Sequence, residues 1–187
     1  MKFLKNFKRT LAAALVGVMA LSGSAFAASS PTSDTANKTT PVTAANVTAD
    51  GTKDVYNTKV SGRTTLEKCN STSETVVVSK ATVKGVTYTV NVLKRNCLKN
   101  NTSVKTVKLK YANQKVLVNE LTFNKSNVKT LVLTKFTKAN QLTIQKDAFK
   151  GSKVKTVKVS KTMSAKEFKK LKKALKAAGF TGKVKRV

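Results

Sequence analysis

The chain has 187 residues, with 37 lysine and arginine residues against eight aspartate and glutamate residues and no histidine, so its formal charge is +29. Without histidine it has no imidazole general base, no Ser-His-Asp or Cys-His pair and no imidazole metal ligand. Two cysteines do not by themselves make a structural zinc site. The composition therefore disfavours an enzyme, predicts no cofactor and no metal, and indicates an anionic partner or a surface that must stay soluble.

The N-terminus has the pattern of a signal peptide. Lys2, Lys5, Lys8 and Arg9 precede the apolar run 11–21, and Ala25-Phe26-Ala27 supplies the small-x-small cleavage pattern. We expect residues 1–27 to be removed after Ala27 and the product to be secreted or held at the cell surface, with no lipid or sorting anchor. An uncleaved N-terminal anchor is the alternative.

The remaining chain changes in composition and charge along its length. Residues 28–53 are rich in Ser, Thr and Ala and predict a flexible spacer, and residues 54–87 predict β lead-in strands that form an N-terminal cap. Residues 28–83 carry six basic and five acidic side chains, a net charge of +1, whereas residues 84–187 carry 27 and three, a net charge of +24. The positive charge therefore belongs to the C-terminal part.

That part contains an internal repeat over residues 88–161. Three segments, 104–109, 128–133 and 154–159, start 24 and 26 residues apart and share the form L-x-x-L-x-L, with Val or Leu in the apolar positions. They predict a leucine-rich-repeat solenoid, mostly β, with a short parallel sheet and irregular or short helical return segments such as 147–151. Ordinary strands that resemble each other by chance are the alternative. Six side chains should point inward: Val107, Leu109, Leu131, Leu133, Val157 and Val159.

The repeats resemble a known family. The run 144–151 (IQKDAFKG) followed by 154–157 (VKTV) looks like a BspA-type leucine-rich repeat, a type common on secreted and surface proteins of anaerobic bacteria. The chain departs from the pattern at Cys97, Leu98 and Leu121, all of them apolar exchanges. The resemblance implies surface adhesion or protein binding and brings no catalytic residues.

Residues 162–187 predict a helical C-terminal cap and a last strand. Ser164 is an N-cap with Glu167 completing a capping box, and Gly179 ends the helix. Phe168, Leu171, Leu175 and Ala178 fall on one face of this amphipathic helix. We expect that face to cover the end of the repeats; a helix lying on an anionic membrane is the alternative.

The two cysteines, Cys69 and Cys97, permit one disulfide in an exported protein. Such a bond would tie the lead-in strands to the first repeat. The alternative interpretation is that both are small apolar core residues.

The expected function is an exported, non-enzymatic binding or adhesion protein. Its lysine surface would bind anionic cell-wall polymers, host glycans or acidic proteins, or would serve solubility only. A membrane-active basic protein in peripheral contact through the cap helix is the alternative, and nucleic acid is disfavoured because no aromatic residues alternate with the basic ones. The candidate binding residues are Lys105, Lys108, Lys129, Lys155 and Lys158 on the sheet, and Lys169, Lys170, Lys172 and Lys173 on the helix.

Overall fold

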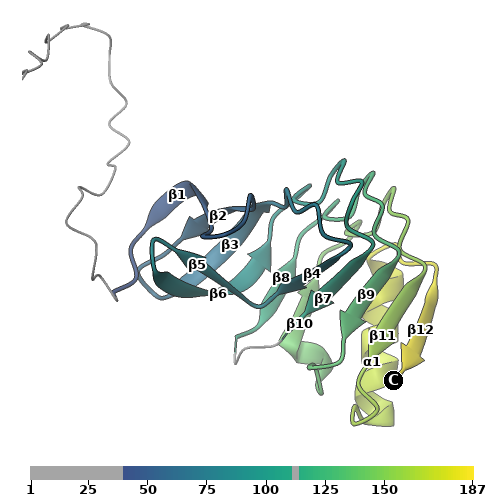
Figure 1. Ribbon diagram of the computed structural model, residues 1–187. Helices are drawn as coiled ribbons and strands as arrows, with labels where there is room; N and C mark the ends of the chain where they lie inside the picture. The colour runs from purple at the N-terminus through teal and green to yellow at the C-terminus, as the bar shows by residue number, and fades with distance from the viewer. Residues whose placement is uncertain (1–39, 111–113) are drawn as a thin grey trace, which may run out of the picture. The chain divides into compact units, whose positions relative to one another are not determined.

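The computed structural model of the protein describes residues 40–110 and 114–187. This part is mostly β-structure, arranged in two sheets with one α-helix near the C-terminus (Figure 1). The predicted mostly-β class with parallel strands and a C-terminal helix is confirmed at this level. The predicted signal peptide lies outside the described residues.

One sheet has seven strands in the order β1-β2-β3-β6-β8-β10, with β5 paired to β6. The pairs at its N-terminal end are antiparallel, whereas β3, β6, β8 and β10 run parallel. Its strands are β1 (Ala44–Thr48), β2 (Val55–Thr58), β3 (Arg63–Lys68), β5 (Lys80–Val83), β6 (Val86–Leu93), β8 (Val116–Val118) and β10 (Leu142–Ile144).

The other sheet has five strands in the order β12-β11-β9-β7-β4, and all four pairings are parallel. The three repeated segments lie side by side in it without a register shift, so Val107 pairs with Leu131 and Leu131 with Val157. The predicted parallel stacking of these segments is therefore confirmed. The strands are β4 (Thr75–Val78), β7 (Thr106–Leu109), β9 (Thr130–Leu133), β11 (Thr156–Val159) and β12 (Lys183–Arg186).

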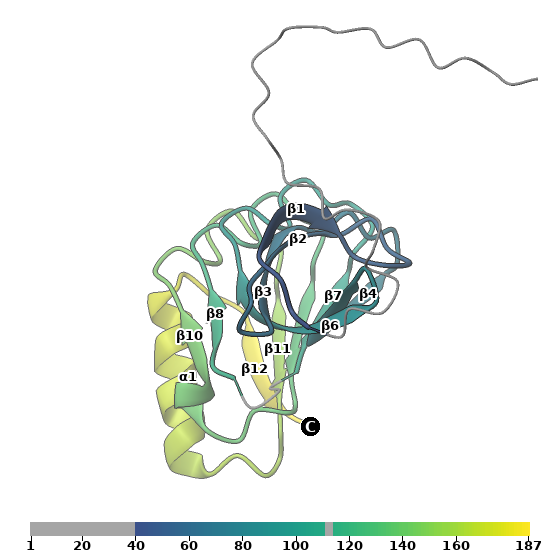
Figure 2. The same cartoon turned by 90° about the vertical axis from the view of Figure 1, so that its left-hand side faces the viewer.

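The core lies between the two sheets, which face each other in Figure 2. The six side chains predicted to point inward are all at most 2 % exposed. Phenylalanine rings continue this core along the stacking direction: Phe123 stacks on Phe149 with centroids 5.1 Å apart, and Phe149 lies 5.3 Å from Phe180. Each added strand therefore buries the apolar face of the one before it.

The helix α1 (Ala165–Ala177) covers the C-terminal end of the core (Figures 1 and 2). Ser164 is its N-cap, accepting the Glu167 backbone N–H at 3.3 Å, and Leu171 and Leu175 are buried as predicted. Only half of the predicted capping box forms. The Glu167 carboxylate instead accepts the backbone N–H of Ala139 at 2.8 Å, in the short 3-10 helix η1 (Ala139–Gln141), which the sequence did not suggest.

The prediction of a flexible spacer up to residue 53 is wrong for its last part. Residues 44–48 form β1, which pairs with β2 and packs Val47 against the core. The Asp50 carboxylate then accepts the backbone N–H groups of Lys84 and Gly85 at 2.9 and 2.8 Å. Apolar periodicity did not reveal this strand because it lies at an edge and buries little of its surface.

The return segments are turns, so the helical turn predicted at 147–151 does not form. Each turn uses left-handed backbone at the same two positions of the repeat, first at Asn96, Leu121 and Asp147 and then at Asn100, Lys125 and Gly151, with φ between 52° and 67°. A left-handed residue interrupts the helical hydrogen-bond pattern, which explains the turn.

The phenylalanine contacts predict where the fold is most sensitive. Phe149→Ala should lower the free energy of unfolding by about 3–5 kcal/mol, because it opens a cavity between two rings. Lys158→Ala, on the exposed side of the same repeat, should change it by no more than about 0.5 kcal/mol. Urea titration followed by circular dichroism measures both, and similar losses in the two variants would contradict this account of the core.

Candidate anion-binding surface

The outer face of the five-stranded sheet carries aligned lysines because the strands pair without a shift. Lys108 pairs with Val132, Val132 with Lys158, and Lys158 with Lys185. Lys108, Lys158 and Lys185 are exposed and lie on the side opposite the buried apolar row. Adjacent strands are ~4.8 Å apart, so Lys158 and Lys185 lie on neighbouring strands, and Lys108 lies two strands away from Lys158.

A second row of lysines lies just before the strands. The backbone N–H of Lys129 donates to Lys105 O at 2.8 Å, and that of Lys155 donates to Lys129 O at 2.9 Å. These three side chains are exposed and follow one another at the strand spacing. Glu74 occupies the equivalent place before β4 and pairs with Lys105, whose ammonium holds the pKa of the Glu74 carboxyl below its ordinary value.

The described part of the chain offers few carboxylates to neutralise these rows. Its salt bridges join Lys94 to Glu67, Arg95 to Glu120, Lys105 to Glu74 and Lys170 to Glu167. Only two of the nine predicted lysines therefore have an acidic partner there. The other seven carry positive charge toward solvent, and neighbouring charges repel by roughly 1 kcal/mol or less in water.

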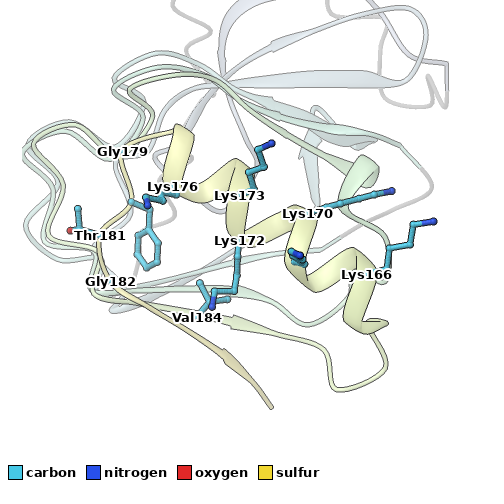
Figure 3. Close-up of a pocket in the computed structure, with 11 residues that line it drawn as sticks. Lys166, Lys170, Lys172, Lys173, Lys176, Gly179, Thr181, Gly182 and Val184 are labelled. Atoms are coloured by element: carbon cyan, nitrogen blue, oxygen red, sulfur yellow. The ribbon is translucent and has the colours of Figure 1, made fainter.

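The helix lysines lie around a groove of about 940 Å³ between α1 and β12 (Figure 3). Lys169, Lys170, Lys172 and Lys173, all predicted, line it together with Lys166 and Lys176, which were not predicted. Phe180 and Val184 give the groove an apolar side. The structure thus separates the predicted lysines into two groups, one on the sheet face and one around this groove.

Cation–aromatic contacts join the helix to the last strand beside the groove. The Arg186 guanidinium lies 4.5 Å from the centroid of the Phe168 ring, and Lys172 Nζ lies 5.7 Å from it. The negative charge of Glu167 is already neutralised locally, because its carboxylate accepts hydrogen bonds from Lys170 Nζ at 2.9 Å and from the Ala139 N–H. The same two donors, Lys170 first, hold the pKa of Glu167 below its ordinary value.

The sequence contained a signal for the basic residues of β12, which were not included in the predicted site. Residues 184–187 (VKRV) repeat the pattern that opens each earlier copy. Residues 183–186 form the strand that pairs with β11, so Lys183, Lys185 and Arg186 continue the basic surface of the sheet as far as the strand beside the groove. Asn101, which lies four residues before Lys105, was also missed. Asn101 Nδ2 donates to Cys69 O and Ser71 O, which ties the first repeat to the lead-in strands.

The two cysteines are free and buried, so the disulfide that the sequence permitted is not formed in this structure. Their segments are joined instead by the Cys69 backbone N–H, which donates to Cys97 O at 2.8 Å. Burial, and then the Asp54 carboxylate, raise the pKa of the Cys69 thiol to about 12, and burial raises the pKa of Cys97 as well. Both side chains pack as small apolar core residues, which is the alternative interpretation of the pair.

Residues 40–110 and 114–187 hold no cluster of three His, Cys, Asp or Glu side chains that could ligate a metal ion. This part of the chain also holds no helix of the length and hydrophobicity needed to cross a bilayer. Comparisons with known proteins found no matching family model, no similar curated protein and no similar solved structure.

Gly182 controls how closely β12 approaches its neighbour. A Cβ atom at this position would lie 2.3 Å from the carbonyl oxygen of Lys155, a backbone atom that cannot turn away. Gly182→Ala should therefore lower the free energy of unfolding by about 2 kcal/mol or more and weaken the β11–β12 pairing. Thermal unfolding and amide exchange of Lys183 measure this.

Gly51→Ala is the matched control, because a Cβ there has open space and the cost, from the left-handed backbone alone, should be about 1 kcal/mol. Equal losses in the two variants would show that β12 does not approach β11 as closely as the structure has it.

The buried thiols should resist alkylation in the native protein and react rapidly in urea. Since the folded state holds the Cys69 proton more tightly, its contribution to the free energy of unfolding is complete below the pKa of the unfolded thiol, ~8.5, and is lost as the pH rises to about 12. Mass spectrometry after iodoacetamide treatment at pH 8 tests this, and equal labelling rates in the native and unfolded protein would contradict it. A native mass two hydrogens lower would instead support the disulfide.

Proposed function

We propose that this chain is an exported, non-enzymatic leucine-rich-repeat protein of the BspA type that binds anionic polymers at the cell surface, such as wall polymers or host glycans. The observation that carries the proposal is the outer sheet face, where the register places lysines in rows at the strand spacing with few carboxylates nearby. Acidic proteins present the same chemistry and belong to the same class of partner.

The solenoid part of the proposal is supported by the path of the chain between the sheets. From β6 to β11 the strands alternate, β6, β8 and β10 in one sheet and β7, β9 and β11 in the other. One strand of each sheet together with its turn then makes one repeat. The left-handed positions recur 25 and 26 residues apart in the three turns, close to the 24 and 26 residues between the starts of β7, β9 and β11, which also supports a repeated unit.

The charge pattern suits a polymer better than a single small anion. A small anion needs several donors that converge on one point, whereas the lysines on the sheet lie along two lines. A chain with regularly spaced negative groups can contact several of them at once and releases the counterions that both surfaces hold. It also relieves the repulsion between neighbouring lysines. The predicted consequence is affinity that falls steeply with salt.

Two other hypotheses have less support. Action on a membrane through α1 needs a free apolar face, yet Leu171 and Leu175 are 2 % and 0 % exposed and pack into the core. Nucleic-acid binding favours aromatic side chains among the basic ones. The outward positions of β7, β9 and β11 carry threonine, lysine and valine instead.

The proposal predicts a specific loss of polymer binding. In the variant Lys108→Gln, Lys129→Gln, Lys158→Gln, the affinity for heparin should fall about 10-fold at low salt, because three exposed ion pairs contribute ~0.5 kcal/mol each. The slope of log affinity against log salt should also become shallower, since fewer counterions are released. Isothermal titration across a salt series measures both.

The control Lys99→Gln, Lys125→Gln, Lys146→Gln removes the same charge from exposed positions on or beside the turns. It should retain most of the affinity, because the net charge alone is not what binds. Equal losses of affinity in the two variants would mean that the net positive charge of the protein, and not the lysines on the sheet face, binds the polymer. Loss of all binding at physiological ionic strength would leave the lysines a role in solubility only.

A further inference from the structure

Among residues 40–110 and 114–187, no strand pairs with the outer edge of β12, where the five-stranded sheet ends. The order of strands stops there, and the backbone bonds that β12 makes go to β11: Lys183 N–H to Lys155 O at 2.8 Å and Val187 N–H to Val159 O at 3.0 Å. Alternate residues of a strand point their N–H and C=O groups to opposite sides. The backbone groups of Val184 and Arg186 therefore face the open edge, where a further strand would pair.

The groove beside this edge is the part of the core end that α1 leaves incompletely covered. The inward row of the sheet runs Val107, Leu131, Val157 and Val184; the first three are 0 % exposed, whereas Val184 is only half-buried and lines the groove. Phe180, the last ring of the phenylalanine series, lines it too. An apolar side chain from an added strand would continue both series.

The charge around the edge is predominantly positive. Six lysines of α1 line the groove (Figure 3). Strand β12 adds Lys183, Lys185 and Arg186. The acidic side chain of α1 is Glu167, which is already bonded to Lys170 and Ala139. A second copy of this chain would bring the same positive charges to the edge, which disfavours pairing of β12 with itself.

We propose that an extended acidic peptide segment of a partner protein binds here, adding a strand to β12. Its backbone would pair with Val184 and Arg186, its apolar residue opposite Val184 would enter the groove, and acidic residues on either side would meet Lys183 and Lys185. A polysaccharide or a lipid headgroup can match the charge but lacks alternating N–H and C=O groups. This site is separate from the polymer surface on the sheet face, so either can fail without the other.

The test uses a synthetic peptide of alternating glutamate and valine, with a peptide of the same composition in two blocks as its control. The alternating peptide should bind with one-to-one stoichiometry and at least about 10-fold more tightly than the block peptide, because only alternation presents acidic and apolar side chains on opposite faces of a strand. Equal affinity of the two peptides would overturn the proposal. So would binding of anionic phosphatidylglycerol vesicles without binding of the peptide.

Two variants of Val184 distinguish the contribution of its backbone N–H to peptide binding from that of its side chain. Val184→Pro removes the N–H that faces the open edge while leaving the bonds of Lys183 and Val187 to β11, and Val184→Ala shortens the side chain but keeps the N–H. We expect Pro to reduce peptide affinity about 10-fold more than Ala does. Equal effects would overturn strand addition. Circular dichroism and thermal unfolding verify that both variants remain folded.

Amide exchange tests the same point in the unaltered protein. Peptide binding should slow the exchange of the Val184 and Arg186 amides about 10-fold or more and leave the Lys183 amide, already bonded to Lys155, nearly unchanged. Unchanged exchange at Val184 and Arg186 with the peptide bound would overturn the proposal even where the proline variant does not fold.

The lysines of β12 that would meet the acidic residues are tested with variants of equal charge. Lys183→Gln, Lys185→Gln should lower peptide affinity about 5-fold, whereas Lys99→Gln, Lys125→Gln should change it by less than about 2-fold. Equal losses would mean that the peptide is held by net charge and not by the edge of β12, which would overturn the proposal.

Discussion

The parallel, unshifted pairing of β7, β9, β11 and β12 is the constraint on which the other features depend. Because each residue of one strand pairs with its counterpart in the next, the inward positions of β7, β9 and β11 form continuous apolar rows, whereas the outward positions carry threonine, lysine and valine. A shift of one residue would place the lysines in the core. The burial of Val107, Leu131 and Val157 thus fixes where Lys108 and Lys158 lie.

This dependence links stability to charge. The same burial of apolar surface that stabilises the stack aligns like charges on the outside, where water and salt screen their repulsion. The few carboxylates are used locally: Glu74 pairs with Lys105 and Glu167 ties α1 to η1. The uncompensated lysines are therefore a cost to folding that a polyanion would remove, which connects the proposed function to the energetics of the fold.

The two ends of the repeated region are closed differently. At the N-terminal end, antiparallel strands extend the seven-stranded sheet, and Asn101 joins the first repeat to the segment after β3. At the C-terminal end α1 buries Leu171 and Leu175, yet β12 keeps an open edge and Val184 stays half-buried. Charged residues protect such edges of natural sheets from unwanted pairing. Lys183, Lys185 and Arg186 can do this and can also attract an acidic strand.

The sequence by itself determined the repeated strands, their inward residues, the helix with its Ser164 cap and Gly179 end, and the concentration of charge after residue 83. The strands and the helix follow from apolar periodicity and capping, which depend on residues close together in the sequence. Only the tertiary structure decided the partner of Glu167, the strand at Ala44–Thr48, the left-handed backbone at Leu121 and the groove beside β12. Each of these depends on contacts between residues far apart in the chain, and no local pattern encodes them. The division of the lysines into a sheet face and a groove has the same origin, since it depends on how α1 folds back beside the last strand.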